Sequence, residues 1–179
     1  MQLGPVEAPA PRVQVVEMEC RNPMCWGMMP ELVRRVGQFA EEEGQPGVGI
    51  ISDLVHNFVA PILPQAASFR PWMRAWCLCS ENGIVGHVVG EVNYDHGNPF
   101  CVVTQYASDD GSPFPRESIV AVWDDLMSWA GTLGAKKVNI LARSEIHAKA
   151  YAAFYKLKPV GKVLMERAIE KPGGGGLNG

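Results

Sequence analysis

Two spacings of apolar residues run along this chain, and together they predict a mixture of strands and helices. Short β-branched and aromatic runs predict strands, and apolar positions that recur every three to four residues predict amphipathic helices. The expected strands lie at residues 13–18, 75–80, 84–92, 100–107, 137–142 and 161–169. The expected helices lie at residues 30–43, 50–59, 118–133 and 145–157. This order, in which three hairpin-connected strands precede an alternation of helices and strands, predicts a mixed sheet with helices on its faces.

Proline and glycine positions indicate where several elements begin and end. Pro30 would take the favoured first position of the first helix, which leaves Trp26 in an apolar loop before it. We expect that loop either to fold onto the core or to offer a surface to a partner. The dipeptide Asn82-Gly83 is typical of a tight hairpin turn.

The composition is that of an ordinary folded domain with distinct ends. Of the 179 residues, 47% are hydrophobic and 20% are charged, which is close to average globular usage. We expect one domain over residues 13–170. Residues 1–12 carry prolines among small residues and are expected to form an extended arm, and the glycine-rich residues 171–179 are expected to form a flexible tail.

The net charge and the cysteine content indicate which ligands the chain is poorly suited to bind and in which cellular compartment it is expected. The formal net charge is −3, so the chain has no large positive field for nucleic acid or for an anionic membrane surface. No apolar run approaches the ~18 residues of a membrane span. The five cysteines, an odd number, argue against a secreted disulfide framework, and Cys77 and Cys79 lack the second pair of ligands that a zinc site needs. We therefore expect a cytoplasmic protein without a bound metal.

Several segments taken together resemble the GNAT family of acyl-CoA N-acyltransferases, and its phage-encoded members in particular. The segments that match the family's order and spacing are VQVVEMECR (13–21), ELVRRVGQFAEEE (31–43), ENGIVGHVVGEV (81–92), WAGTLGA (129–135), KKVNIL (136–141) and AYAAFYKLKPVGK (150–162). The resemblance covers roughly residues 13–169. It implies an α/β (α+β) fold, with a mixed, mostly antiparallel central sheet of about six to seven strands flanked by about four helices.

The resemblance places the family's coenzyme A pyrophosphate loop on residues 114–119, where this chain departs from the family motif. The motif has glycines, so that backbone N–H groups can approach the diphosphate at the start of a helix. Residues 114–119 read FPRESI and contain no glycine. Pro115 has no N–H to donate, and Ile119 carries a β-branched side chain where the family keeps glycine or alanine.

Within residues 114–119, some side chains would favour a bound anion and others would oppose it. Arg116 has the right charge, whereas Glu117 adds a negative charge beside the expected site. Ser118 is expected to cap the following helix. The resemblance therefore implies a degenerate cofactor-binding loop, whose candidate residues are Arg116, Glu117, Ser118 and Ile119.

For the reaction itself, the resemblance implies a base on the central strands and an acid on the last helix. Glu91 and His87 are four residues apart on one expected strand and so point to the same face, and Glu91 is the candidate base for an attacking amine. The family's tyrosine position falls on Phe154, and a shift of one residue makes Tyr155 the candidate proton donor, with Tyr151 another reachable hydroxyl. The alternative is that Glu91 is a paired or solvated strand carboxylate and that the three aromatic residues pack in the core.

Two functions from different classes follow. In the first, the chain is a GNAT-like scaffold without a cofactor, acting as a non-catalytic interaction or assembly component, for example of a phage particle in the host cytoplasm or the virion. The arm and the tail would then contact other protein chains, including further copies of this one. In the second, the chain is an acetyl-CoA-dependent N-acetyltransferase acting on an amine, with Glu91 as the base and Tyr155 as the acid. The missing glycines favour the first function, and neither function involves nucleic acid or a membrane.

Overall fold

The computed structural model describes residues 13–44, 47–63, 70–109, 111, 114–142, 145–159 and 164–168. For residue 154 and residues 164–168 it describes the backbone alone. The expected arm (1–12) and tail (171–179) lie outside the described residues. Within them, none of the helices combines the length and the apolar character that a membrane span requires.

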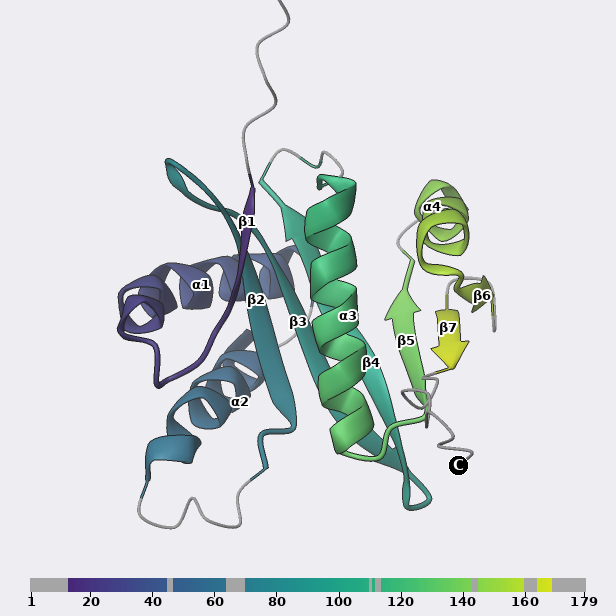
Figure 1. Cartoon of the computed structure of the whole chain (residues 1–179), viewed down its shortest axis with the longest axis horizontal. Coiled ribbons are helices and arrows are strands. Elements are labelled where there is room, and N and C mark those ends of the chain that lie inside the picture. The colour runs from purple at the N-terminus through teal and green to yellow at the C-terminus, as the bar shows by residue number, and fades with distance from the viewer. Residues whose placement is uncertain are drawn as a thin grey trace, which may run out of the picture.

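Helices and strands follow one another in the predicted order (Figure 1). In chain order the elements are β1 (Gln14–Glu17), α1 (Pro23–Glu42), α2 (Gly47–Val59), the 3₁₀ turn η1 (Ala60–Ile62), β2 (Met73–Ser80), β3 (Gly83–Asp95), β4 (Asn98–Ser108), α3 (Arg116–Thr132), β5 (Lys137–Leu141), α4 (Glu145–Tyr155), β6 (Lys158–Pro159) and β7 (Leu164–Ala168). The short strand β6, which pairs with β7, is an addition to the predicted set.

The described strands form one seven-stranded sheet in the order β1-β2-β3-β4-β5-β7-β6. Neighbouring strands are antiparallel except β4 and β5, which are parallel. Antiparallel neighbours need only a tight turn between them, whereas the parallel pair needs a crossover, and α3 supplies it. The predicted α+β fold, with a mixed and mostly antiparallel sheet, is confirmed.

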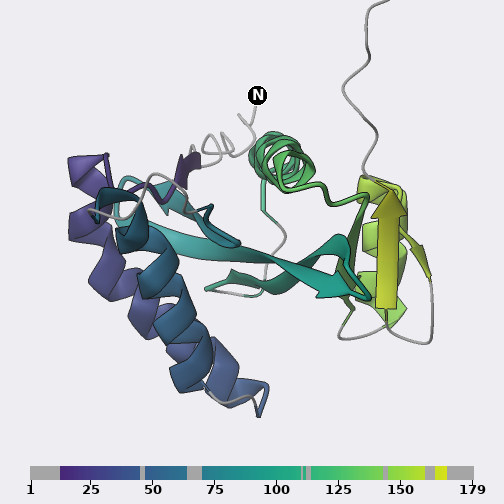
Figure 2. The same cartoon turned by 90° about the horizontal axis from the view of Figure 1, so that it is seen from below.

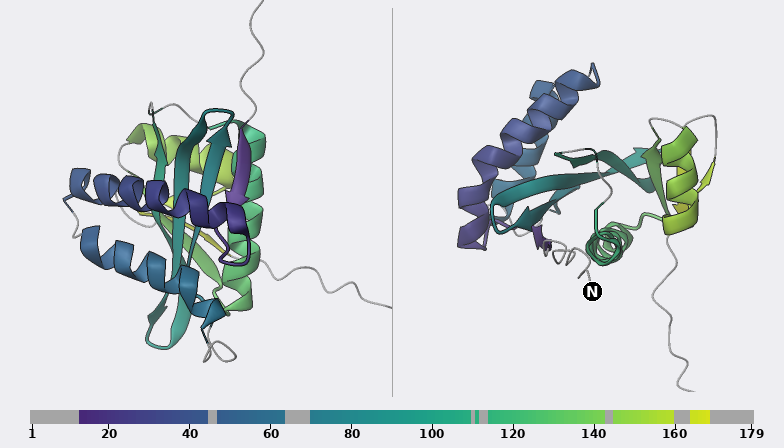
Figure 3. Two further views of the ribbon diagram at one scale, coloured as in Figure 1. Left: turned by 90° about the vertical axis from the view of Figure 1, so that its left-hand side faces the viewer. Right: turned by 90° about the horizontal axis from the view of Figure 1, so that it is seen from above.

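Helices cover both faces of the sheet and divide its core in two. α1 and α2 lie on one face and α3 on the other (Figures 2 and 3), and α4 packs into the same core as α3. The core on the α3 side includes Trp76 and Leu126, and the core on the α1 side includes Leu32 and Leu54. Because both faces of the central strands are buried, β2 and β3 read as long apolar runs rather than as a strict alternation.

The first helix begins at Pro23, so the prediction that it begins at Pro30 was wrong. Asn22 is the N-cap residue, and its side-chain oxygen accepts a hydrogen bond from the backbone N–H of Met24 (3.1 Å). Pro23 takes the first helical position, where its missing N–H costs nothing. Pro30 therefore lies inside the helix. Pro23 and Pro30 both precede the periodic apolar pattern. The helix begins at Pro23 because Asn22 caps it there.

Trp26 is consequently a residue of α1 and not of a loop, contrary to the sequence prediction. Its ring lies edge-on to Phe58 of α2, with ring centroids 4.9 Å apart. Its indole N–H donates a hydrogen bond to the carbonyl oxygen of Cys20 (2.7 Å). These contacts hold the side chain against the segment before α1 and against α2, although it remains 44% exposed.

Strand β3 is approached very closely by neighbouring groups at Gly86. A Cβ atom added there would lie 2.2 Å from the Phe114 ring and 2.6 Å from the carbonyl oxygen of Ala107. The Phe114 ring therefore rests directly on the β3 backbone, at a position where a side chain has no room. Gly27 in α1 offers the opposite case, because a Cβ added there meets nothing within 4 Å.

We predict that the same substitution has opposite effects at these two glycines. Gly86→Ala should lower the free energy of unfolding by about 1–3 kcal/mol, because the added methyl group overpacks the contact with a backbone oxygen. Gly27→Ala should raise it by about 0.5–1 kcal/mol, because alanine loses less conformational freedom in a helix. Urea unfolding of both variants measures the two changes. A Gly86→Ala variant as stable as the parent chain would contradict the packing of Phe114 on β3.

Candidate functional site

β4 and β5 separate after a short stretch of pairing, and this divergence forms the candidate site. In the described part of the chain the two strands pair from Cys101 to Val103 on β4 and from Val138 to Ile140 on β5. Immediately beyond, Thr104 is an extra residue on β4, where the pairing with β3 shifts between Val89 and Gly90. Its hydroxyl donates to the carbonyl oxygen of Val89 (3.3 Å). A bulge of this kind bends its strand, so the last residues of β4 turn away from β5 (Figure 1).

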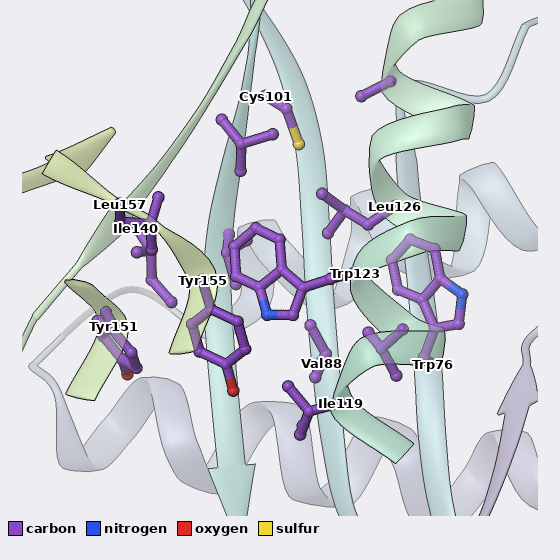
Figure 4. Close-up of a cluster of buried hydrophobic side chains, with 14 of the residues drawn as sticks. Trp76, Val88, Cys101, Ile119, Trp123, Leu126, Ile140, Tyr151, Tyr155 and Leu157 are labelled. Carbon is purple, nitrogen blue, oxygen red and sulfur yellow. The ribbon is translucent and has the colours of Figure 1, made fainter. Parts of the chain in front are cut away.

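Aromatic side chains fill the space where the two strands diverge. Tyr106 of β4 lies edge-on to Phe114, just before α3 (ring centroids 5.5 Å), and edge-on to Tyr151 of α4 (6.1 Å). Tyr155 of α4 lies against Trp123 of α3 (4.8 Å), as Figure 4 shows. We call these five side chains the aromatic cluster. Together they connect β4, α3 and α4 across the divergence.

A hydrogen bond between two tyrosines spans the divergence inside this cluster. The hydroxyl of Tyr155 lies 3.2 Å from that of Tyr106, and it also has a side-chain hydrogen bond with Trp123. Tyr155 is 9% exposed, and burial raises the pKa of both tyrosines. Both hydroxyls therefore keep their protons at neutral pH, and Tyr155 is chemically a proton donor rather than a base.

A small cavity among the described residues adjoins the aromatic cluster. Its volume is about 40 Å³, and it is lined by residues of β4, β5, α4 and the end of α1 that include Tyr106, Tyr151 and Glu43. At about 10–15 Å³ for each water molecule, such a cavity holds roughly three waters. Pockets for small molecules usually measure about 300–1,000 Å³, so this cavity by itself is too small for a ligand of that size.

Two solved structures have a similar architecture over nearly the whole chain. An aminoglycoside 6′-acetyltransferase of type Ii superposes with a TM-score of 0.55, covering 88% of this chain and 98% of its own, at 14% identity. An acetyltransferase of the GNAT family from Staphylococcus aureus Mu50 superposes with a TM-score of 0.52, covering 89% and 100%, at 8% identity. The chain has a GNAT-like fold. No family model matches the sequence and no curated protein matches it, so the likeness is one of fold.

The GNAT resemblance places the coenzyme diphosphate at the start of α3. The residue at which this helix begins and the way it is capped both differ from the sequence prediction. The helix begins at Arg116, with Pro115 as its N-cap residue and no side-chain cap. Ser118 is therefore the third residue of the helix and does not cap it, which corrects the prediction. Its buried hydroxyl instead donates to the carbonyl oxygen of Val13 (3.2 Å) and holds the start of β1 against α3.

The other candidate residues at the start of α3 lie in different environments. Ile119 is 3% exposed and belongs to the core on the α3 side, while its backbone N–H donates to the carbonyl oxygen of Pro115 (3.2 Å). Arg116 and Glu117 are exposed to solvent. Glu117 lies in the first turn, where a carboxylate already compensates the positive end of the helix dipole. An anion bound there would be repelled by this carboxylate and attracted by Arg116.

The structure does not bring the candidate base and the candidate acid together. Glu91 pairs in the sheet with Val102, and its carboxylate accepts a hydrogen bond from the side chain of Asn93 (2.6 Å). Tyr155 bonds to Tyr106, which lies four residues further along β4, or roughly 13 Å at the usual rise of a strand. The interpretation of Glu91 as a paired strand carboxylate therefore fits its surroundings. The side chain of Phe154, at the family's tyrosine position, lies outside the described residues.

His87 lies on the α1 side of β3 and connects three elements through a polar chain. It is 2% exposed, and its ring lies edge-on to Phe39 of α1 (6.0 Å). Its Nε2 is 2.8 Å from Oε1 of Gln105, and Nε2 of Gln105 donates to the carbonyl oxygen of Val36 (3.1 Å). Burial lowers the pKa of His87 from 6.5 to about 4. The imidazole is thus neutral at physiological pH.

Sequence reasoning missed Tyr106 and Gln105, and it placed Phe114 only in the expected diphosphate loop. The pair Thr104-Gln105 interrupts the apolar run of β4, and this interruption is the one signal that could have indicated a bulge. Nothing in the local sequence indicates that Tyr106 reaches α4, because that contact depends on how α4 packs.

We predict that His87 makes the fold less stable in mild acid. Its pKa is lower in the folded chain than in the unfolded chain, so the unfolded chain binds the proton first as the pH falls. The contribution is complete above about pH 6.5 and declines toward pH 4, with about 2 kcal/mol lost between pH 7 and pH 5. Urea unfolding across this range measures the loss, and a His87→Gln variant should show a shallower dependence. Equal slopes for the two proteins would contradict the prediction.

Proposed function

We propose that this chain uses the GNAT fold as a non-catalytic binding scaffold and that its coenzyme cleft is closed by its own side chains. The observation that carries the proposal is the hydrogen bond between Tyr106 and Tyr155 (3.2 Å), which joins β4 to α4 across the space where the strands diverge. In an acetyltransferase with this fold, the resemblance leads us to expect the acyl-CoA arm in that space.

The geometry at the diphosphate end of the cleft supports the same proposal. Pro115 has no N–H to offer an anion, and the carboxylate of Glu117 lies in the first turn of α3. Ile119 gives its N–H to the helix and its side chain to the core. Of the candidate residues, Arg116 alone carries a charge that favours a diphosphate. The described residues therefore do not fit coenzyme A well at either end of the cleft.

In this proposal the partners are other protein chains. The arm (1–12) and the tail (171–179) would bind neighbouring subunits, for example in a phage particle assembled in the host cytoplasm. Their composition supports this role, because proline-rich and glycine-rich segments that gain little from intramolecular packing can order on binding a partner.

A second candidate function, acetyl-CoA-dependent N-acetyl transfer to an amine, is favoured by two observations. The bulge at Thr104 separates β4 from β5, which gives the fold a place for an extended ligand. Tyr155 also carries a protonated hydroxyl at this divergence, where it would serve as a proton donor. Glu91 is less well placed for its role as base, because it lies well down β3 and is paired with Asn93.

We predict that the chain neither binds acetyl-CoA nor transfers its acetyl group to an amine. Isothermal titration at millimolar acetyl-CoA should give no binding heat, and a thiol-release assay with an amine acceptor panel should give no signal above buffer. Tyr155→Phe is the matched variant, since it removes the proton donor and keeps the ring. Micromolar binding by the parent chain, together with turnover that the variant loses, would establish the second function and exclude the first.

We further predict that the ends of the chain are needed for assembly and not for folding. A variant without residues 1–12 and 171–179 should keep the melting temperature of the full chain, because these proline-rich and glycine-rich segments contain few of the large apolar residues that build a core. It should fail to enter the assembled particles that the full chain enters, as measured by co-sedimentation from the native host. Incorporation at the level of the full chain would show that the partners are bound elsewhere.

A further inference from the structure

A cavity lies among α1, α2 and the edge of the sheet at β1 and β2, apart from the aromatic cluster. Its volume is about 300 Å³, which reaches the lower end of the usual range for small-molecule pockets. Its wall combines the segment that joins β1 to α1, the side of α1 at Met29, the second half of α2 and the start of β2. It shares no described lining residue with the small cavity beside the aromatic cluster. It is therefore a separate candidate site.

Apolar side chains make up most of the described wall. Three methionines line it from three different segments, namely Met18 after β1, Met29 in α1 and Met73 in β2. Leu54 and Phe58 add apolar surface from α2, and all five side chains are at most 9% exposed. Methionine sulfur makes favourable contacts with aromatic rings, so this wall suits an aromatic ligand.

Hydrogen bonds to the backbone hold these walls in place. The N–H of Met18 donates to the carbonyl oxygen of Ala75 (2.9 Å), which fixes the segment after β1 against β2. The side-chain oxygen of Asn57 accepts from the N–H groups of Trp72 (2.8 Å) and Met73 (3.2 Å), which ties α2 to the start of β2. The walls are therefore positioned before a ligand arrives, and binding does not have to order them.

The charged side chains at the cavity balance one another. Its described lining includes two acidic residues, Glu17 and Glu19, and two basic residues, Arg21 and Arg74. Arg74 forms an ion pair with Glu17 and also lies over the Trp129 ring, 5.6 Å from its centroid. A ligand with a net charge would have to compete with these partners or leave its charge uncompensated beside apolar walls. The lining thus favours a neutral ligand.

The volume of the cavity indicates the size of that ligand. An apolar cavity of about 150 Å³ holds one benzene molecule, and this cavity has about twice that volume. We propose that it binds a neutral, planar aromatic molecule of two fused rings. This function goes beyond the scaffold role, and it would operate whether or not the chain binds acetyl-CoA.

The probe for this site is quinoline, which has two fused rings and is neutral at pH 8. NMR of the full chain, labelled with carbon-13 at its methionine methyl groups, reports binding because an aromatic ring shifts the resonances of methyl groups that lie against it. Quinoline should shift the methyl resonances of Met18, Met29 and Met73 in a saturable way. Met127 packs against the core on the α3 side, so its resonance should not move.

Two further compounds test size and charge separately. Pyridine has only one of the two rings, so it buries less apolar surface and should bind about tenfold or more weakly than quinoline. N-methylquinolinium keeps both rings and adds a fixed positive charge, so it should also bind about tenfold or more weakly.

Substitutions that fill the cavity test its location. Ala75→Leu enlarges the wall from β2 and Met29→Phe enlarges it from α1, and either change should abolish the quinoline-dependent shifts of Met18 and Met73. Ala121→Leu is the matched control, because Ala121 is exposed on α3, and this variant should bind quinoline like the parent chain. Melting temperatures show which variants are folded, and the compound series decides the proposal even if a filling variant fails to fold.

Two results would overturn the proposal. The first is a set of Met18, Met29 and Met73 resonances that quinoline leaves unchanged or shifts no more than that of Met127. The second is binding that pyridine or N-methylquinolinium matches, or that a folded filling variant retains, since the ligand is then not a neutral two-ring molecule held in this cavity.

Discussion

The short parallel pairing of β4 with β5 is the constraint on which the rest of this architecture depends. The strands share hydrogen bonds from Cys101 to Val103, and the bulge at Thr104 then turns β4 away. Backbone groups at a strand edge must be covered or solvated, because leaving them buried and unpaired is costly. In this chain, aromatic side chains from α4 and from the segment before α3 pack against Tyr106 directly after the bulge.

The end of β4 is held from both faces by interactions of different kinds. On the α3 side Tyr106 packs among aromatic rings and bonds to Tyr155. On the α1 side Gln105 bonds to His87 and to the backbone of α1. Because successive side chains of a strand alternate, two neighbouring residues contribute to an aromatic cluster on one face and to a polar chain that reaches α1 on the other. A shift of one residue in the bulge would exchange these two environments.

Element type and order were predictable from periodicity, and the interactions that shape the site were not. The apolar spacing in residues 118–133 indicates a helix regardless of its surroundings, and the Asn82-Gly83 turn fixes a hairpin locally. Where α1 begins depended on Asn22 as a cap, a local contact that two nearby prolines obscured. The role of Ser118 depended on β1, more than a hundred residues earlier in the chain. Contacts of that range are set by tertiary packing, which one sequence read alone does not specify.

If the cleft is closed as we propose, a coenzyme arm must replace the contacts that it displaces before binding becomes favourable. In this proposal the arm separates Tyr106 from Tyr155, whose hydroxyls are hydrogen-bonded, and each buried aromatic side chain contributes about 1.5–3 kcal/mol. Displacing two therefore costs about 3–6 kcal/mol, which weakens a micromolar ligand by roughly two to four orders of magnitude. The glycine-rich cradle that could offset this cost is absent from residues 114–119. The two departures, at the arm and at the diphosphate, thus act in the same direction, and restoring one of them alone would leave the other still opposing the cofactor.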